Sequence, residues 1–248
     1  MNVIYYGDTN IGNIRPRNED AFVIKEVWGG SHILAVVADG VGGNGGGDVA
    51  ANLACKCITD YFNDLGVLMY GSDNLIDAVR FANNMICSVH YIPYLSHMSC
   101  VLTAALINLE TGKMDVCHVG DTRLYTLEKG VFTKVTSDHS LVGPLEEYRQ
   151  ITEREAMKHP HRNIITRSIG NDILVDGTEY IQTHTIKLKP CTLLLCSDGL
   201  YDMVYSSQIV EILSDPVSVD KRVEKLIGTA LYAGGKDNVT VIIIDLMK

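Results

Sequence analysis

The sequence predicts an α+β fold in which two antiparallel β-sheets are flanked by pairs of helices, a four-layer α/β/β/α sandwich. Strand hairpins are followed by a pair of amphipathic helices, and further strands are followed by a second helix pair. Hydrophobic residues make up 46% of the chain, which is enough for a large core. Because 248 residues leave little room for a second core, we expect a single domain over residues 1–248.

Apolar runs and periodicities define the elements of the first half. Residues 21–27 and 32–38 read as buried strands around the turn at residues 29–31. Apolar residues recur at three- and four-residue steps over residues 45–65 and again over 74–90, as in amphipathic helices. The next four strands are expected at residues 101–109, 113–119, 124–128 and 131–135.

The regular pattern stops between Ser137 and Asp172. Charges, histidines, prolines and one short helical piece near residues 152–157 replace the core stripe. A segment of this length without a core stripe is usually functional or mobile, with an ordinary surface loop as the alternative. Beyond it we expect strands at 181–188, 193–196 and 239–246 and helices at 207–213 and 219–233.

Charge and cysteine content exclude several classes of function. The chain has 30 acidic and 21 basic side chains, a net charge of −9, which disfavours nucleic acid or an anionic membrane as the main partner. Its apolar runs are too short to span a membrane, and no signal peptide opens it. The odd number of cysteines, seven, suggests reduced thiols. We expect a cytoplasmic monomer.

Four aspartates share one setting, the end of a buried strand. They are Asp39, Asp121, Asp198 and Asp237. A single such aspartate is usually a turn former. A sheet brings strand ends together, however, and four crowded anions repel unless a cation neutralises them. Carboxylates, water and a backbone carbonyl, here that of Gly40, suit Mg²⁺ or Mn²⁺.

A second cluster, Arg15 to Asp20, precedes the first long strand. Arginine is the natural two-pronged partner of a phosphate, and adjacent carboxylates can hold that arginine or a metal-bound water. In isolation a solvated loop would be the preferred interpretation, but beside the aspartate set the functional one is stronger. The histidines and cysteines lack the spacing of a zinc site.

These motifs resemble the metal-dependent serine/threonine protein phosphatase family of type 2C, over almost the whole chain. The chain is most similar to compact bacterial members. Any one motif would be weak evidence, but their common order is specific. The motifs are Arg15–Asp20, Ala38–Gly43, Gly120–Arg123, Asp138–Ser140, Thr166–Gly170, Ser197–Asp202 and Asp237–Thr240.

The resemblance implies a centre of two Mg²⁺ or Mn²⁺ ions at one end of the two sheets. By this resemblance Asp39 would bridge both ions, and Asp198 and Asp237 would complete the protein ligands of the first. The carbonyl of Gly40 would bind the second, which Glu19 would reach through water.

The same resemblance implies roles around the metal pair. Arg15 would clamp the substrate phosphate, so that Arg15 and Asp39 are the expected catalytic residues. Asp121, together with Asp198, would hold a weaker third ion, as in bacterial members. Asp20 and Asn238 would support the site.

The activity implied is hydrolysis of phosphoserine and phosphothreonine by a water that bridges the two metals, without a phosphoenzyme. Many animal relatives carry a histidine, proposed as general acid, where this chain has Val41, which leaves the proton donor open. The implied partners are phosphorylated proteins, including a serine/threonine kinase and its substrates. The resemblance also implies that the irregular stretch is a flap subdomain beside the site, over about residues 138–172, and its part from about Leu141 to Arg162 is the expected source of selectivity.

Two other functions compete with this one. A catalytically inactive phosphoprotein-binding regulator on the same scaffold would be expected to lack Asp39, Asp198 or Asp237, and all three are present. A two-metal phosphodiesterase would use similar chemistry, but the −9 charge and the lack of a basic stripe disfavour a polynucleotide substrate.

Overall fold

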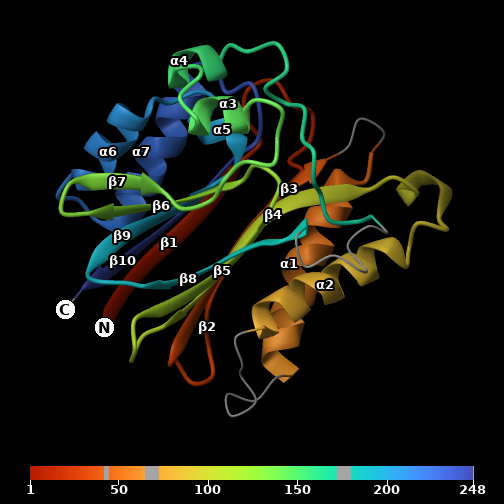
Figure 1. Ribbon diagram of the computed structural model, residues 1–248, viewed down its shortest axis with the longest axis horizontal. Helices are drawn as coiled ribbons and strands as arrows, with labels where there is room; N and C mark the ends of the chain where they lie inside the picture. Colours follow the sequence, from red (N-terminus) through yellow and green to blue (C-terminus); the bar gives the residue numbers. More distant parts are fainter. Residues whose placement is uncertain (42–44, 65–72, 172–179, 248) are drawn as a thin grey trace.

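Two five-stranded antiparallel sheets form the centre of the computed structural model, which describes residues 1–41, 45–64, 73–171 and 180–247 (Figure 1). The first sheet has the order β1-β10-β9-β6-β7 and the second the order β2-β3-β4-β5-β8. In the first sheet the strands are β1 (Asn2–Asn10), β10 (Val239–Met247), β9 (Cys191–Cys196), β6 (Arg123–Glu128) and β7 (Val131–Lys134). In the second they are β2 (Asp20–Val27), β3 (His32–Val41), β4 (Ser99–Asn108), β5 (Lys113–Val119) and β8 (Gln182–Lys187).

Long helices cover the outer face of each sheet and complete the four layers (Figure 1). The second sheet packs against α1 (Gly47–Asp64) and α2 (Asn74–Cys87), and the first against α6 (Ser206–Ser214) and α7 (Val219–Tyr232). A third apolar cluster fills the space between the sheets. This arrangement confirms the predicted fold class. None of the described helices has the length and apolar character that a bilayer span requires.

Strand β1 was absent from the sequence-based expectation. It pairs with β10 over its whole length, from Asn2 opposite Met247 to Asn10 opposite Val239. Its outward positions include Ile4 and Tyr6, which are 51% and 41% exposed, so the usual alternation of apolar and polar residues is hidden.

The expected flap contains more helix than the sequence indicated. Two short helices, α3 (Gly143–Glu147) and α4 (Glu153–Ala156), lie in it, and a Thr152–Glu155 capping box stabilises the second. Isolated bridges join Ser140 to Ile165 and Cys100 to Ile169.

Outside the flap the described residues form two more short helices, α5 (Asp198–Tyr201) and the 3₁₀ helix η2 (Pro93–Leu95). Four residues of the expected motif, first helix and flap lie outside the described residues: Gly42, Gly43, Leu65 and Asp172.

Candidate metal centre and phosphate site

A cleft of about 220 Å³ opens where the two sheets meet at one end. Most of its lining comes from the residues that the sequence singled out, and Val101 of β4 with Asn163 and Ile165 of the flap forms the remaining wall. The lining residues are Arg15, Glu19, Asp39, Gly40, Val41, Val101, Asp121, Asn163, Ile165, Asp198, Asp237 and Asn238. The cleft therefore brings together residues from both ends of the sequence and from both sheets.

Asp20 links the two sheets below the cleft. It begins β2 directly opposite Asp39 of β3. Its Oδ2 accepts hydrogen bonds from the hydroxyls of Ser197, at 2.7 Å, and Thr240, at 2.6 Å, both from the other sheet's side. This 6% exposed carboxylate thus fixes the position of Asp39 relative to the start of α5.

The loop that carries Arg15 is shaped by Asn238. The Asn238 side chain accepts a hydrogen bond from the backbone N–H of Glu19 and donates to the carbonyls of Ile11 and Arg17. Arg15 itself donates from Nη2 to Oδ2 of Asp237 at 2.6 Å, and its side chain is 44% exposed at the cleft. A phosphate entering the cleft would meet this guanidinium.

Two glycines let backbone segments approach closely beside the cleft. Gly40 donates its N–H to the carbonyl of Glu19 at 3.0 Å. A Cβ on Gly40 would lie only 2.3 Å from the carbonyl carbon and oxygen of Gly47, the first residue of α1. A Cβ on Gly47 would lie 3.1 Å from Oε1 of Glu19, so the start of α1, the Gly40 peptide and the Glu19 carboxylate are neighbours.

Burial, and then repulsion between neighbours, raises the pKa of the carboxyl groups around the cleft. Burial, followed by repulsion from the neighbouring aspartates, raises the pKa of Asp39 and Asp198 well above the ordinary value. Burial, with repulsion from Asp138, raises the pKa of Asp121 to about 7, and burial raises that of Asp20 to about 6. Burial and then Asp48 raise the pKa of Glu19. The site therefore holds more negative charge than its protein neighbours neutralise.

The residues present fit a hard divalent cation by their chemistry. All donors are oxygens, and Oδ1 of Asp20 and of Asp198 are buried with no hydrogen-bond partner within the described residues. In the described part of the chain no three acidic, histidine or cysteine side chains already enclose a cation position. Asp237 is instead bonded to Arg15, and one oxygen of Asp20 to two hydroxyls.

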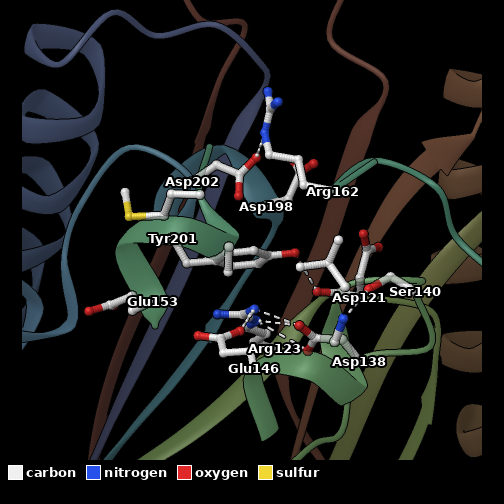
Figure 2. Close-up of a pocket in the computed structure, with 14 residues that line it drawn as sticks. Asp121, Arg123, Asp138, Ser140, Glu146, Glu153, Arg162, Asp198, Tyr201 and Asp202 are labelled. Carbon is white, nitrogen blue, oxygen red and sulfur yellow. Dashed lines mark hydrogen bonds and ion pairs between the residues drawn. The ribbon is translucent and has the colours of Figure 1, made fainter. Parts of the chain in front are cut away.

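Asp121 and Asp198 also border a second, inner cavity of about 30 Å³ beneath the flap (Figure 2). There the hydroxyl of Tyr201 donates to the carbonyl of Asp121 at 2.9 Å, and the guanidinium of Arg123 lies 3.6 Å from the centre of the Tyr201 ring. Tyr201 lies in the Ser197–Asp202 motif, and the resemblance assigned it no role. Its polar contact, like the position of Asn163, depends on a tertiary approach with no local signal.

Comparisons with known proteins point to a single family. A family model described as protein phosphatase 2C matches residues 7–227. The serine/threonine phosphatase stp of Listeria monocytogenes (serovar 1/2a) is 33% identical over 244 residues, covering 96% of this chain and 93% of the relative. The structure of Stp1 from Staphylococcus aureus superimposes with a TM-score of 0.90 at 28% identity, covering 100% of this chain and 96% of that one.

A further solved structure is the catalytic domain of the serine/threonine protein phosphatase PstP in complex with two manganese ions. It matches with a TM-score of 0.83 at 30% identity, covering 99% of both chains. The family match spans most of the chain, the relatives match nearly full length, and the fold is the same. This chain therefore belongs to the protein phosphatase 2C family and is a serine/threonine protein phosphatase.

Proposed function

We propose that residues 1–248 form one catalytic domain that hydrolyses phosphoserine and phosphothreonine in proteins with two Mn²⁺ or Mg²⁺ ions, and a third bound more weakly. The observation that carries the proposal is the crowding of mutually repelling carboxylates around one cleft that an arginine also lines. The manganese ions of the PstP catalytic domain support the choice of metal.

Each ligand role is assigned to a residue in or beside this cleft. Asp39 would hold both ions, Asp198 and Asp237 the first, and the Gly40 carbonyl the second, with Glu19 acting through water. Two divalent cations bound here would neutralise the carboxylates, activate a water and stabilise charge on the phosphoryl group. This donor set contains only oxygens, which suits both candidate metals.

A third ion would use the pair of carboxylates that the cleft shares with the inner cavity. These belong to Asp121 and Asp198. Asp20 supports the ligand set by fixing Asp39 and the start of α5, and Asn238 by shaping the Arg15 loop.

Arg15 would bind and orient the substrate phosphate. Its guanidinium is paired with Asp237 on one side and exposed to the cleft, so a phosphate dianion can approach it without first crossing a hydrophobic barrier. A planar guanidinium offers two parallel donors to phosphate oxygens. Val41 also lines the cleft but has no proton to donate. The leaving oxygen of the serine or threonine side chain must therefore obtain its proton from another group.

The substrates would be phosphorylated proteins, among them a serine/threonine kinase and the proteins that it phosphorylates. The flap, residues 138–172, would select among them, because Asn163 and Ile165 place it against the cleft that holds the phosphate.

The test is metal-dependent turnover by the purified protein. We expect hydrolysis of p-nitrophenyl phosphate and of phosphoserine and phosphothreonine peptides with Mn²⁺ or Mg²⁺, and none after chelation. Asp39→Ala should be inactive while its circular dichroism matches that of the wild type. Turnover that survives chelation would refute the metal mechanism, and peptide binding without turnover would favour the inactive regulator.

A further inference from the structure

A buried ion-pair network around Arg123 lies where the flap meets the start of β6 (Figure 2). Arg123 and Asp138 are 8% and 6% exposed. The guanidinium donates to the Asp138 carboxylate from Nε, at 3.1 and 3.0 Å, and from Nη2, at 2.5 Å. Burial would raise the pKa of Asp138, but Arg123 and Lys134 hold it below its ordinary value. This buried pair is therefore ionised.

One edge of the same guanidinium reaches the flap. Nη2 of Arg123 donates to Oε2 of Glu146, in α3, at 2.9 Å. The neighbouring acid of α3, Glu147, accepts only an exposed bond from Ser137 among the described interactions. Helix α4 and the end of the flap are attached at other points, Glu153 to Ser206 and Arg162 to Asp202. Glu146 is thus the charged link between α3 and the buried network, while Gly143 at the start of α3 packs against the backbone of Asp138.

The face of the guanidinium is connected to the cleft through Tyr201. It stacks on the ring of Tyr201, and the hydroxyl of that ring holds the carbonyl of Asp121. The turn that contains Asp121 is closed on its other side by His139, whose N–H donates to the Gly120 carbonyl and whose Nδ1 accepts from the Gly120 N–H. A shift of the guanidinium would therefore move a residue that lines the catalytic cleft.

Only arginine can make all these contacts at once. Its rigid fork bonds Asp138 and Glu146 along its edges while its flat face remains available to Tyr201. A lysine in this place would keep the charge but would have neither the second edge nor the stacking face.

We propose that Arg123 is a positioning residue that couples the docking of flap helix α3 to the placement of Asp121. The coupling itself needs no metal. Its consequence for catalysis rests on the proposed function, because it acts through the proposed ligand Asp121. Docking of α3 by Glu146 then sets the affinity of the site for its weaker metal ion.

The first experiment measures amide hydrogen exchange in the full-length, metal-free protein, so it is independent of turnover. Glu146→Gln should speed exchange about tenfold in α3, because glutamine can still accept from Arg123 but lacks the charge that strengthens this hydrogen bond. It should also speed exchange, by a smaller factor, at the amides of Gly120 and His139, which report on the distant turn. Glu147→Gln is the matched control and should leave both regions unchanged.

Faster exchange in α3 alone would overturn the proposal, because Glu146 would then only anchor the flap. Equal effects of Glu146→Gln and Glu147→Gln would also overturn it. Arg123→Lys should loosen both regions even though it keeps the positive charge. If it leaves the turn at Gly120 intact, the fork and the stacked face are not needed and the assigned role is wrong.

The second experiment is a double-mutant cycle of Glu146→Gln and Tyr201→Phe, read as the Mn²⁺ concentration for half-maximal hydrolysis of p-nitrophenyl phosphate. Each single change should raise this Mn²⁺ concentration several-fold with little change in KM. In the double mutant the fold-increase should be smaller than the product of the two single-mutant increases. Strictly multiplicative effects would show that the two contacts act independently. Absence of any turnover would refute the proposed function and leave the exchange result to decide the coupling.

Discussion

Replacing Asp20 by asparagine should stabilise the metal-free protein at neutral pH while impairing catalysis. Asp20 is 6% exposed, and burial raises the pKa of its carboxyl from 3.8 to about 6. A shift of roughly 2 units corresponds to about 3 kcal/mol of unfavourable free energy for the ionised carboxylate in the folded state. Asparagine keeps an oxygen to accept the hydroxyl hydrogen bonds of Ser197 and Thr240 but carries no charge.

The gain must depend on pH in one direction. Between pH 3.8 and about 6 the folded protein holds a proton on Asp20 that the unfolded chain has released. The stability contributed by this group is therefore fully present below pH 3.8 and is lost as the pH rises through 6. Relative to the wild type, Asp20→Asn should show no gain near pH 4 and the full gain of about 3 kcal/mol above pH 7.

The assay is urea unfolding of chelator-treated wild type and variant between pH 4 and 8. The exposed Asp64→Asn is the control and should change the free energy of unfolding by less than about 0.5 kcal/mol. Added Mn²⁺ should stabilise the wild type, because a ligand that binds the folded state adds stability. It should stabilise Asp20→Asn less, because asparagine lacks the charge with which Asp20 supports the ligand set. A variant no more stable than the wild type at pH 7.5, or a difference that does not change with pH, would refute the reasoning.

Three further predictions concern the same end of the molecule. Arg15→Ala should raise KM for p-nitrophenyl phosphate more than it lowers kcat, measured at saturating Mn²⁺, and an unchanged KM would remove Arg15 from phosphate binding. Asp198→Ala should lower turnover at least ~100-fold without changing the circular dichroism spectrum, and retained activity would exclude it as a ligand. Gly199→Ala should cost about 3 kcal/mol or more in thermal unfolding, because its Cβ would lie 2.0 Å from the carbonyl oxygen of Asn238. The exposed helical Gly228 has open space around its Cβ position, so Gly228→Ala should instead stabilise by about 0.5–1 kcal/mol, and equal effects of the two would contradict the packing argument.

The long elements that the sequence predicted carry a regular apolar pattern. Strands such as β3 and β10 are buried on both faces and read as continuous apolar runs, and α1 and α2 carry a clear apolar stripe. Strand β1 fails this criterion because Ile4 and Tyr6 lie on its exposed face. Helices α3 and α5 have five and four residues, which is too short for a helical period to become visible.

The site divides in the same way. Aspartates at strand ends could be predicted to meet, since the sheet itself brings strand ends together. The contacts that hold them could not, because they join residues remote in the chain. Asp20 meets Thr240 across 220 positions, and Arg123 stacks on Tyr201 through packing that no local pattern records.

The two groups of buried carboxylates in this protein differ in where their counter-charge comes from. Asp138 forms salt bridges with Arg123 and Lys134, and these cations hold its pKa below the ordinary value against the effect of burial. Asp39 and Asp198 form no salt bridge within the described residues, and burial and mutual repulsion raise their pKa well above it. Where the acid is structural, the chain supplies its own cation. Leaving Asp39 and Asp198 without a cation from the chain costs stability. That cost is offset only when a cation from solution binds between these carboxylates and neutralises them.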